Sequence, residues 1–186
     1  MYCPEVFAET RSEILRARNQ RYPLATLVSM GANGPEAYHI LLYLAAGEGA
    51  QPVLQGHVAR ANPLWREAPP DGEVLVIFQG PQHYISPSWY ATKAETGKVV
   101  PTWNYAVVHA HGQLQVKDDP DWVRKQMISL TAQQENNFTL PWQVDDAPQD
   151  FTEQLIGQVA GIEIPVFRWA GKWKVSQMLT DNKVSS

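Results

Sequence analysis

Short stretches of apolar and β-branched residues, separated by turns rich in glycine and proline, constrain the fold of this chain most strongly. Strands joined by hairpin-length turns are typical of an antiparallel sheet, and several in succession are typical of a barrel or sandwich. We expect strands over residues 24–30, 36–45, 52–58, 73–78, 103–116, 161–169 and 172–177. Turns are expected at 31–35 and 47–51. The predicted fold class is mainly β, an antiparallel barrel with flanking helices.

One helix is expected before the first strand. Thr10 and Glu13 have the spacing of a capping box, so this helix should begin after Thr10 and end near Gln20. Residues 81–102 are rich in Pro, Ser, Tyr and Lys without a period, and their aromatic content favours a long ordered loop. Loops of this length are usually functional or disordered.

A second helix should follow the strand over 103–116. Asp119 is a suitable N-cap, Pro120 suits the first helical position, and the helix should end near Asn136. Its buried seam is expected to contain Val123, Met127 and Leu130. No GxGxxG segment follows a strand, which argues against a Rossmann-type dinucleotide site.

Composition limits the functional classes. A chain of 186 residues with 44% apolar and 18% charged residues can form one domain, here expected over 1–186, with a sizeable core. The net charge of −4 argues against nonspecific nucleic-acid binding by the domain as a whole. Cys3 is the only cysteine, so no internal disulfide is possible. The sequence shows neither a signal peptide nor an apolar run of about 18 residues, and we therefore expect a cytoplasmic protein.

The segment over 56–62 is a candidate anion site. A strand ends there and the chain turns into a short helix, where backbone N–H groups and the Arg60 guanidinium could hold a phosphate. The alternative is structural: Arg60 would pair with a surface carboxylate and Asn62 would cap the turn. The residues alone leave both interpretations open.

Two further segments could contact a planar ligand. Trp103 offers an aromatic face and Asn104 a hydrogen-bonding edge, although both also suit a barrel core and a turn. In an extended chain Lys172, Lys174 and Ser176 share one face, which could meet a phosphate or the N1–O2 edge of a flavin. They could equally form a solvated strand edge.

The histidines are only weak evidence for a metal site. His109 and His111 lie on one face of the same strand, and such a pair can bind zinc or iron when a third ligand is present. The candidates for that ligand are scattered, so we expect no metal.

Six blocks of this sequence together resemble the PaiB family of FMN-binding negative transcriptional regulators. They follow the family's order, cover nearly the whole chain, and include the long segments ISPSWY and VPTWNY. The blocks are Met1–Pro4, Ala25–Val28, Gly56–Asn62, Gly80–Tyr90, Val100–Tyr105 and Lys174–Gln177.

The resemblance implies a split barrel like that of pyridoxamine phosphate oxidases, with FMN at a two-fold homodimer interface. It implies a phosphate and ribityl cradle at the end of one strand, a second strand beside the flavin ring, and contacts from the terminal strand, which the partner could supply. The implied FMN-binding positions are His39, Ile40, His57, Arg60, Ala61, Asn62, Trp103, Asn104, Lys174, Ser176 and Gln177.

This sequence departs from the family pattern at two places. Leu41 stands where the family usually has a proline, and Met178 stands where an asparagine usually follows Ser-Gln. The first change puts the ring environment in question, and the second, with the short C-terminus, puts any function of the usual tail in question.

Three functions remain open. The resemblance implies a flavin-binding repressor that senses redox or metabolite state; direct DNA contact would then require arginines 11, 16, 18 and 21 or the basic C-terminal segment. The alternative is an FMN-dependent oxidoreductase acting on a small molecule, for which only His39, His57 and Tyr105 suggest themselves as acid or base. A further alternative is haem binding or breakdown through one of the five histidines.

Overall fold

The computed structural model describes residues 1–45, 51–67 and 72–177. The helices are α1 (Ser12–Arg21), α2 (Leu64–Glu67), α3 (Thr92–Thr96), α4 (Pro120–Glu135) and α5 (Gln149–Ile156). The strands are β1 (Ala8–Glu9), β2 (Leu24–Gly31), β3 (Gly34–Leu41), β4 (Tyr43–Ala45), β5 (Val53–Ala59), β6 (Glu73–Ile85), β7 (Thr102–Gln113), β8 (Gln115–Lys117) and β9 (Val159–Lys174). Short 3₁₀ turns cover Glu5–Phe7, Pro87–Trp89 and Val144–Asp146.

The strands form one antiparallel sheet in the order β3-β2-β6-β7-β9-β5-β4, with β1 and β8 also pairing with β9. The long strand β9 joins the two halves of the sheet. Its first part pairs with β5 and β8, and its last part pairs with β7. This arrangement confirms the predicted antiparallel split-barrel class.

The core follows from the alternation of side chains along each strand. The inward residues of β2, β6, β7, β5 and β9 are fully or almost fully buried, whereas their neighbours face outward. Large strand residues of this cluster include Leu27, Phe78, Leu54, Ile162 and Ile164.

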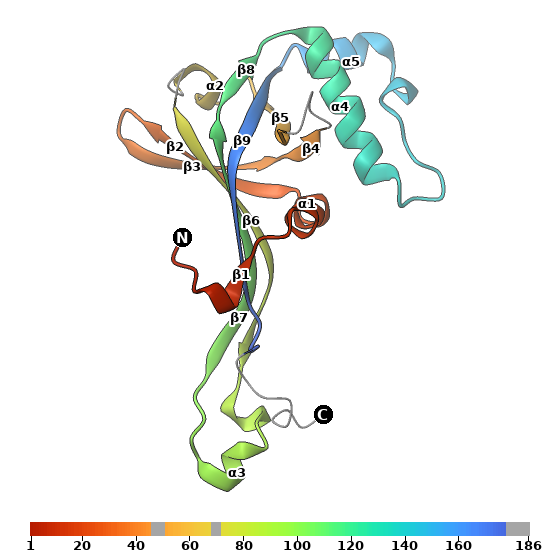
Figure 1. Ribbon diagram of the computed structural model, residues 1–186. Coiled ribbons are helices and arrows are strands. Elements are labelled where there is room, and N and C mark those ends of the chain that lie inside the picture. The colour runs from red at the N-terminus through yellow and green to blue at the C-terminus, as the bar shows by residue number, and fades with distance from the viewer. Residues whose placement is uncertain (46–50, 68–71, 178–186) are drawn as a thin grey trace.

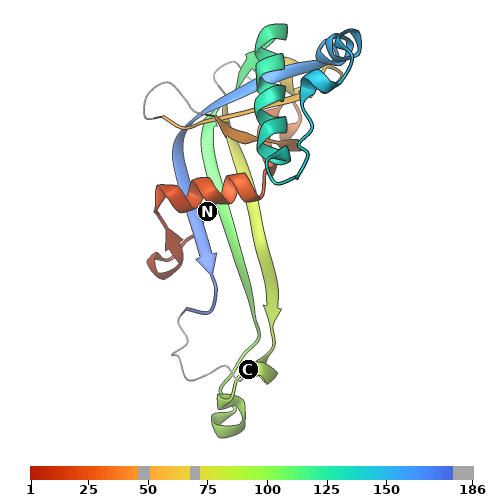
Figure 2. The ribbon, with the colours of Figure 1, turned by 90° about the vertical axis from the view of Figure 1, so that its right-hand side faces the viewer.

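The molecule consists of a barrel and a long arm (Figure 1). The outer parts of β6 and β7, with the end of β9 beside them, run away from the barrel, and α3 lies at the tip of this arm (Figure 1). Helix α1 crosses the strands where the arm leaves the barrel, and α4 and α5 lie beside the barrel (Figure 2). The arm exposes large apolar side chains, including Trp89, Val100 and Trp103.

Several boundaries differ from those expected. The predicted strand over 73–78 continues to Ile85, because the chain passes Gly80 and Pro81 through a bulge where the register shifts between Gln79 and Gln82. The predicted loop over 81–102 is therefore wrong at its start, and it also contains α3. The two strands expected over 161–169 and 172–177 are one strand, β9.

The N-terminal capping box is also wrong. Helix α1 begins at Ser12 with Arg11 at the N-cap and no side-chain cap. Instead, the Glu9 carboxylate accepts hydrogen bonds from the Arg11 backbone N–H (3.0 Å) and from its Nε (2.8 Å). The strand expected over 36–45 breaks at Leu42, which is fully buried.

The second helix agrees with its predicted cap, since the Asp119 carboxylate accepts from the Asp121 N–H at 2.9 Å. Its seam differs, because Gln126 is buried whereas Met127 is only half-buried. Helix α5 was not expected from the sequence. Most of the turn expected over 47–51 lies outside the described residues, as does Met178.

Candidate functional site

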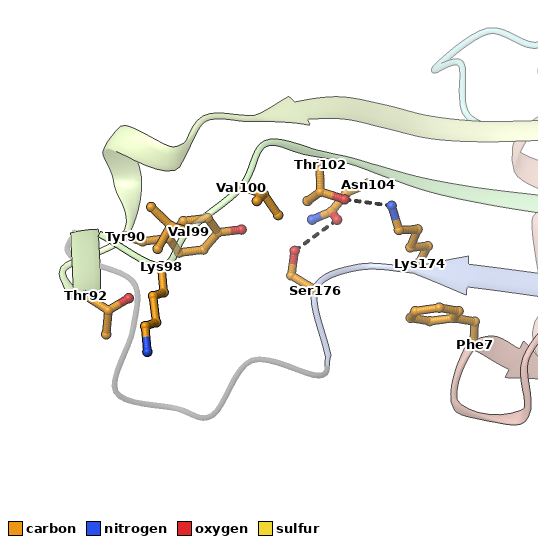
Figure 3. Close-up of a pocket in the computed structure, with 10 residues that line it drawn as sticks. All are labelled: Phe7, Tyr90, Thr92, Lys98, Val99, Val100, Thr102, Asn104, Lys174 and Ser176. Atoms are coloured by element: carbon orange, nitrogen blue, oxygen red, sulfur yellow. Dashed lines mark hydrogen bonds between the residues drawn. The ribbon is translucent and has the colours of Figure 1, made fainter. Parts of the chain in front are cut away.

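Three of the predicted cofactor residues meet near the outer end of β7 and β9. The Lys174 ammonium donates to Thr102 Oγ1 at 2.6 Å and to the Trp103 carbonyl at 3.1 Å. The Ser176 hydroxyl donates to Asn104 Oδ1 at 3.0 Å (Figure 3). Ser176 has a φ of 61°, so the chain makes a left-handed turn where β9 has ended. Two strands and the residues after β9 therefore hold Asn104, Lys174 and Ser176 together.

Gln177 maintains this turn. Its side-chain amide donates to the Trp173 carbonyl at 2.6 Å and to the Val6 carbonyl at 3.1 Å, and its Oε1 accepts from the Val175 N–H at 2.8 Å. These three contacts already use both of its polar atoms. In this structure Gln177 therefore positions the end of β9 instead of presenting a free group to a ligand.

Asn104, Lys174 and Ser176 line a cavity of about 260 Å³ in the arm. Its apolar walls include Phe7, from the N-terminal 3₁₀ turn, and Val99, from the segment before β7. The sequence did not predict the apolar residues of this cavity or its other polar residues. They come from segments that are distant in sequence and meet only in the folded chain.

Trp103 lies on the opposite face of the sheet from Asn104, since consecutive residues of a strand point to opposite sides. It lines a separate cleft of about 360 Å³ together with Gln82 and Tyr105. Its indole N–H donates to Gln82 Oε1 at 3.0 Å, and 47% of its surface is exposed. Trp103 and Asn104, both predicted to approach the flavin ring, therefore line different cavities of the arm.

The predicted phosphate cradle lies at the end of β5. Here the Arg60 Nε donates to the Gly157 carbonyl at 3.1 Å, and a terminal nitrogen contacts the Asp118 carboxylate at 2.6 Å. This ion pair raises the pKa of Arg60 and lowers the pKa of Asp118. The Asn62 side chain accepts from the Leu64 N–H at 2.9 Å and so caps the turn into α2. These contacts match the structural alternative raised for Arg60 and Asn62.

Two backbone donors at this end of β5 are already used. The Arg60 N–H donates to the Gln158 carbonyl at 2.7 Å, and the Asn62 N–H donates to the Ala59 carbonyl at 2.8 Å. The N–H of Ala61, which lies between them in the turn, has no backbone partner among the described residues. A phosphate at this position would therefore be bound by the Ala61 N–H and by the guanidinium, which would be shared with Asp118.

The remaining predicted residues lie on the barrel. His57 Nδ1 is 2.7 Å from Oε1 of the buried Gln126 on α4. His39 is exposed on β3, where its Nδ1 lies 3.2 Å from Thr26 Oγ1. Ile40 points into the core with 5% exposure, so only its backbone could contact a ligand.

His109 and His111, the histidine pair considered for a metal site, have different surroundings on β7. Burial lowers the pKa of His109, and His111 Nδ1 lies 2.8 Å from the Glu73 carboxylate. Within residues 1–45, 51–67 and 72–177, no three His, Cys, Asp or Glu side chains are grouped in a way that could bind a metal ion.

Within one chain, the predicted cofactor residue His57 on the barrel lies far from Lys174 on the arm. His57 pairs with Gly161 at the start of β9, whereas Lys174 pairs with Tyr105 at its end. Thirteen residue steps along β9 separate Gly161 from Lys174, which corresponds to roughly 40 Å of extended strand. A mononucleotide is shorter than this path between His57 and Lys174.

This antiparallel split barrel, with a ring-lined cleft and a cluster of hydrogen-bond donors on its arm, defines a class of flavin-binding proteins. The chain belongs to the family described as "Putative FMN-binding domain", whose model matches residues 1–168. FMN is accordingly the cofactor of this family, and the resemblance to the PaiB family is confirmed.

Particular relatives support this assignment. The chain is 35% identical to the protein AN0679 of Emericella nidulans over 95% of this chain and 84% of that protein. It is 30% identical to the protease synthase and sporulation protein PAI 2 of Bacillus subtilis, over 95% and 82% of the two chains.

Solved structures share the fold at low sequence identity. The FAD and heme binding protein of Mycobacterium smegmatis superimposes with a TM-score of 0.66 at 16% identity, covering 90% of this chain and 73% of that one. The flavocytochrome Anf3 of Azotobacter vinelandii gives a TM-score of 0.64 at 13% identity, covering 97% and 72%. Among the described residues, no helix is long and apolar enough to cross a membrane.

The residues present fit a flavin mononucleotide. Trp103 offers a half-exposed ring to a planar group, and Asn104 and Lys174 retain N–H groups without a hydrogen bond to any other described residue. Arg60 offers a permanent positive charge to a phosphate. When bound, FMN would supply hydride or electron transfer, while the protein orients it and adjusts its electrostatics.

Proposed function

We propose that this protein is a homodimer that binds FMN between the barrel of one subunit and the arm of the other. The observation that supports this proposal is the separation of the predicted cofactor residues. His57 and Arg60 lie at one end of the sheet, and roughly 40 Å of β9 separates Gly161, which pairs with His57, from Lys174 on the arm. His39 lies closer to the arm, because its register leads across the sheet to Ala170, four residues before Lys174. In a dimer with two-fold symmetry, each arm can reach the partner's barrel and form two equivalent sites.

Each part of the site has a chemical role in this proposal. Arg60 binds the phosphate of FMN, and Ala61 and Asn62 hold the turn that carries its guanidinium. The β3 strand at His39 and Ile40 lies beside the flavin, and the partner's Trp103 covers an apolar part of the ring. The partner's Asn104, Lys174 and Ser176 line a different cavity from Trp103, so in this proposal they reach only the edge of the flavin, around the outer end of β9. There they provide donors, and the Lys174 charge favours the anionic reduced flavin.

Complementation between subunits tests this arrangement directly. Arg60→Ala and Trp103→Ala chains with different affinity tags are co-expressed, and the mixed dimer is purified through both tags. Each homodimer carries two defective sites. In the mixed dimer, one site contains both intact groups and the other contains both substitutions. We expect half of its sites to bind FMN with wild-type affinity.

Two results would refute the proposal. If Arg60 and Trp103 of one chain act on the same FMN, every site of the mixed dimer carries one defect and no site recovers. A monomeric mass in solution together with FMN binding would also exclude a shared site. Analytical ultracentrifugation and the visible absorbance spectrum provide these two measurements.

We further propose that the flavin-binding dimer acts in the cytoplasm as a negative transcriptional regulator. The PaiB resemblance supports this role, and the relative PAI 2 is named for protease synthesis and sporulation. The structure disfavours α1 as a simple DNA-binding surface, because Arg11 is paired with Glu9 and the Arg18 guanidinium lies over the rings of Tyr22 and Trp173.

The regulatory role can be separated from oxidoreductase activity by two assays. Binding to promoter DNA in gel shifts at low salt, altered by FMN reduction, is expected of a regulator. Sustained NAD(P)H consumption by the FMN-loaded protein, without DNA binding, would instead favour the enzyme. The cavity in the arm supports either role, since both a sensor and an enzyme require a small-molecule site.

A further inference from the structure

A tyrosine hydroxyl lines the arm cavity. Tyr90 is 8% exposed as a residue, and its hydroxyl makes no hydrogen bond with any residue that the structure describes. Figure 3 shows this hydroxyl directed toward the side of the cavity where Asn104 and Ser176 lie. A hydroxyl can both donate and accept a hydrogen bond, so it can bind a polar group of a ligand in the cavity.

The other polar groups of the cavity have spare donors. Asn104 Oδ1 already accepts from Ser176, which leaves its Nδ2 N–H groups available. Lys174 uses two donors on Thr102 and Trp103, and an ammonium has three. The Lys98 ammonium has no hydrogen bond or ion pair with another described residue. The available groups are therefore mainly donors.

The charge of the cavity is positive and unbalanced. Lys98 and Lys174 line it, and none of the described lining residues is acidic. The rest of the wall is mostly apolar, formed by Phe7, Val99 and Val100. Donors and cations require a ligand with acceptor oxygens, and apolar walls require a hydrophobic body.

We propose that the arm cavity binds a small monocarboxylate with an aromatic or branched aliphatic body. The carboxylate accepts from Tyr90 Oη, the Lys98 ammonium and one Nδ2 N–H of Asn104, and the apolar body packs on Phe7 and Val99. The spare donor of Lys174 and the other Nδ2 N–H of Asn104 stay available to the flavin. The volume of about 260 Å³ lies just below the range of roughly 300–1,000 Å³ typical of drug-sized ligands, so the ligand is small.

The placement of this ligand next to FMN rests on the proposed function, because Asn104 and Lys174 are also the arm residues proposed to meet the flavin. The cavity itself is formed within one chain. The site would therefore bind a second small molecule besides FMN. This molecule would be a metabolite that an FMN sensor detects or that an FMN enzyme transforms.

The first experiment compares three probes of similar size on the wild-type protein. Benzoate, benzyl alcohol and benzylammonium are titrated by calorimetry into the protein with and without FMN. We expect saturable benzoate binding in both cases. The affinity for benzyl alcohol should be at least about tenfold lower, because it lacks the charge-assisted hydrogen bonds, and benzylammonium should be the weakest.

Variants then locate the binding to the cavity. Tyr90→Phe removes only the hydroxyl and Lys98→Met removes only the charge; neither residue belongs to the proposed cofactor contacts. Each should weaken benzoate roughly three- to tenfold and leave FMN affinity unchanged. Lys93→Met is the matched control, because Lys93 lies on α3 and bonds Ser88 outside the cavity.

The outcomes separate this inference from the proposed function. Equal affinities for the three probes, or benzoate binding insensitive to both Tyr90→Phe and Lys98→Met, would overturn the carboxylate site. FMN binding without benzoate binding contradicts only this inference. Benzoate binding that depends on Tyr90, in a protein that does not bind FMN, contradicts only the proposed function.

Discussion

Replacement of Trp103 by alanine provides a quantitative test of the flavin site. The indole is 47% exposed in the single chain and therefore presents a large apolar surface that has no cover within the described residues. A whole tryptophan side chain offers about 250 Å² of surface, so about 120 Å² of Trp103 is uncovered. A flavin ring on one face of the indole would cover about half of that area.

This geometry sets the expected loss. Covering about 60 Å² at about 25 cal/mol per Å² contributes about 1.5 kcal/mol. An aromatic pair contributes about 0.5–1.5 kcal/mol beyond area burial. Trp103→Ala should therefore weaken FMN binding by about 2–3 kcal/mol, which is roughly 30- to 150-fold in Kd. Stability of the free protein should change less, because the ring is already half exposed.

The assay is a titration of FMN fluorescence at fixed ionic strength, with the stability of each variant measured by urea unfolding. Trp89→Ala is the matched control, because Trp89 is also half exposed on the arm (44%) but stacks on His83 and is not a predicted cofactor residue. It should leave the FMN affinity within about twofold of wild type. Equal losses in the two variants, or no loss in Trp103→Ala, would show that the indole does not contact the flavin.

Three further substitutions test other parts of the structure. Arg60→Ala should weaken FMN about tenfold or more, and an unchanged Kd would remove its guanidinium from the phosphate site. The Glu9 carboxylate has its pKa lowered to about 2, chiefly by hydrogen bonds from Arg11, so its stabilisation is complete above its ordinary pKa of 4.5 and is lost as pH falls toward 2. In Glu9→Gln, the free energy of unfolding measured in urea should therefore fall less steeply as the pH is lowered from 4.5 toward 2. The same pH dependence in the variant and the wild type would show that Glu9 is not responsible for it. Gly161→Ala should cost about 1–3 kcal/mol, because its methyl group would lie 2.4 Å from Trp122 Cζ3. Gly157→Ala is the control, because a methyl group there would have no contact closer than 3.5 Å. Equal midpoints of urea unfolding for the two variants would contradict the predicted clash with Trp122.

The β architecture could be predicted from the sequence because strand side chains alternate with period two. The segment over 24–30 and the predicted α4 cap at Asp119 agree with the structure within one residue. The segment around Gly80 and Pro81 could not be predicted in the same way. Glycine and proline normally end strands, but here they occupy a bulge opposite Ala106, where neither a side chain nor the missing proline N–H disturbs the pairing.

The candidate site was predictable only as a set of residues. The family resemblance identified Arg60, Trp103, Asn104 and Lys174, yet their sequence positions do not reveal which of them can meet. Asn104 and Lys174 come together because antiparallel β7 and β9 bring their outer ends side by side. Trp103 lies on the opposite face, although it is adjacent to Asn104 in sequence.

The sequence by itself determined the alternation, the turns and the family, because these depend on local backbone preferences and on residue types. Only the tertiary structure decided that β6 and β7 extend beyond the barrel, that Tyr90 lines a cavity there, and that Arg60 pairs with Asp118. These features depend on contacts between residues far apart in the chain, since a hydrogen bond or a cavity exists only where the fold brings its members together.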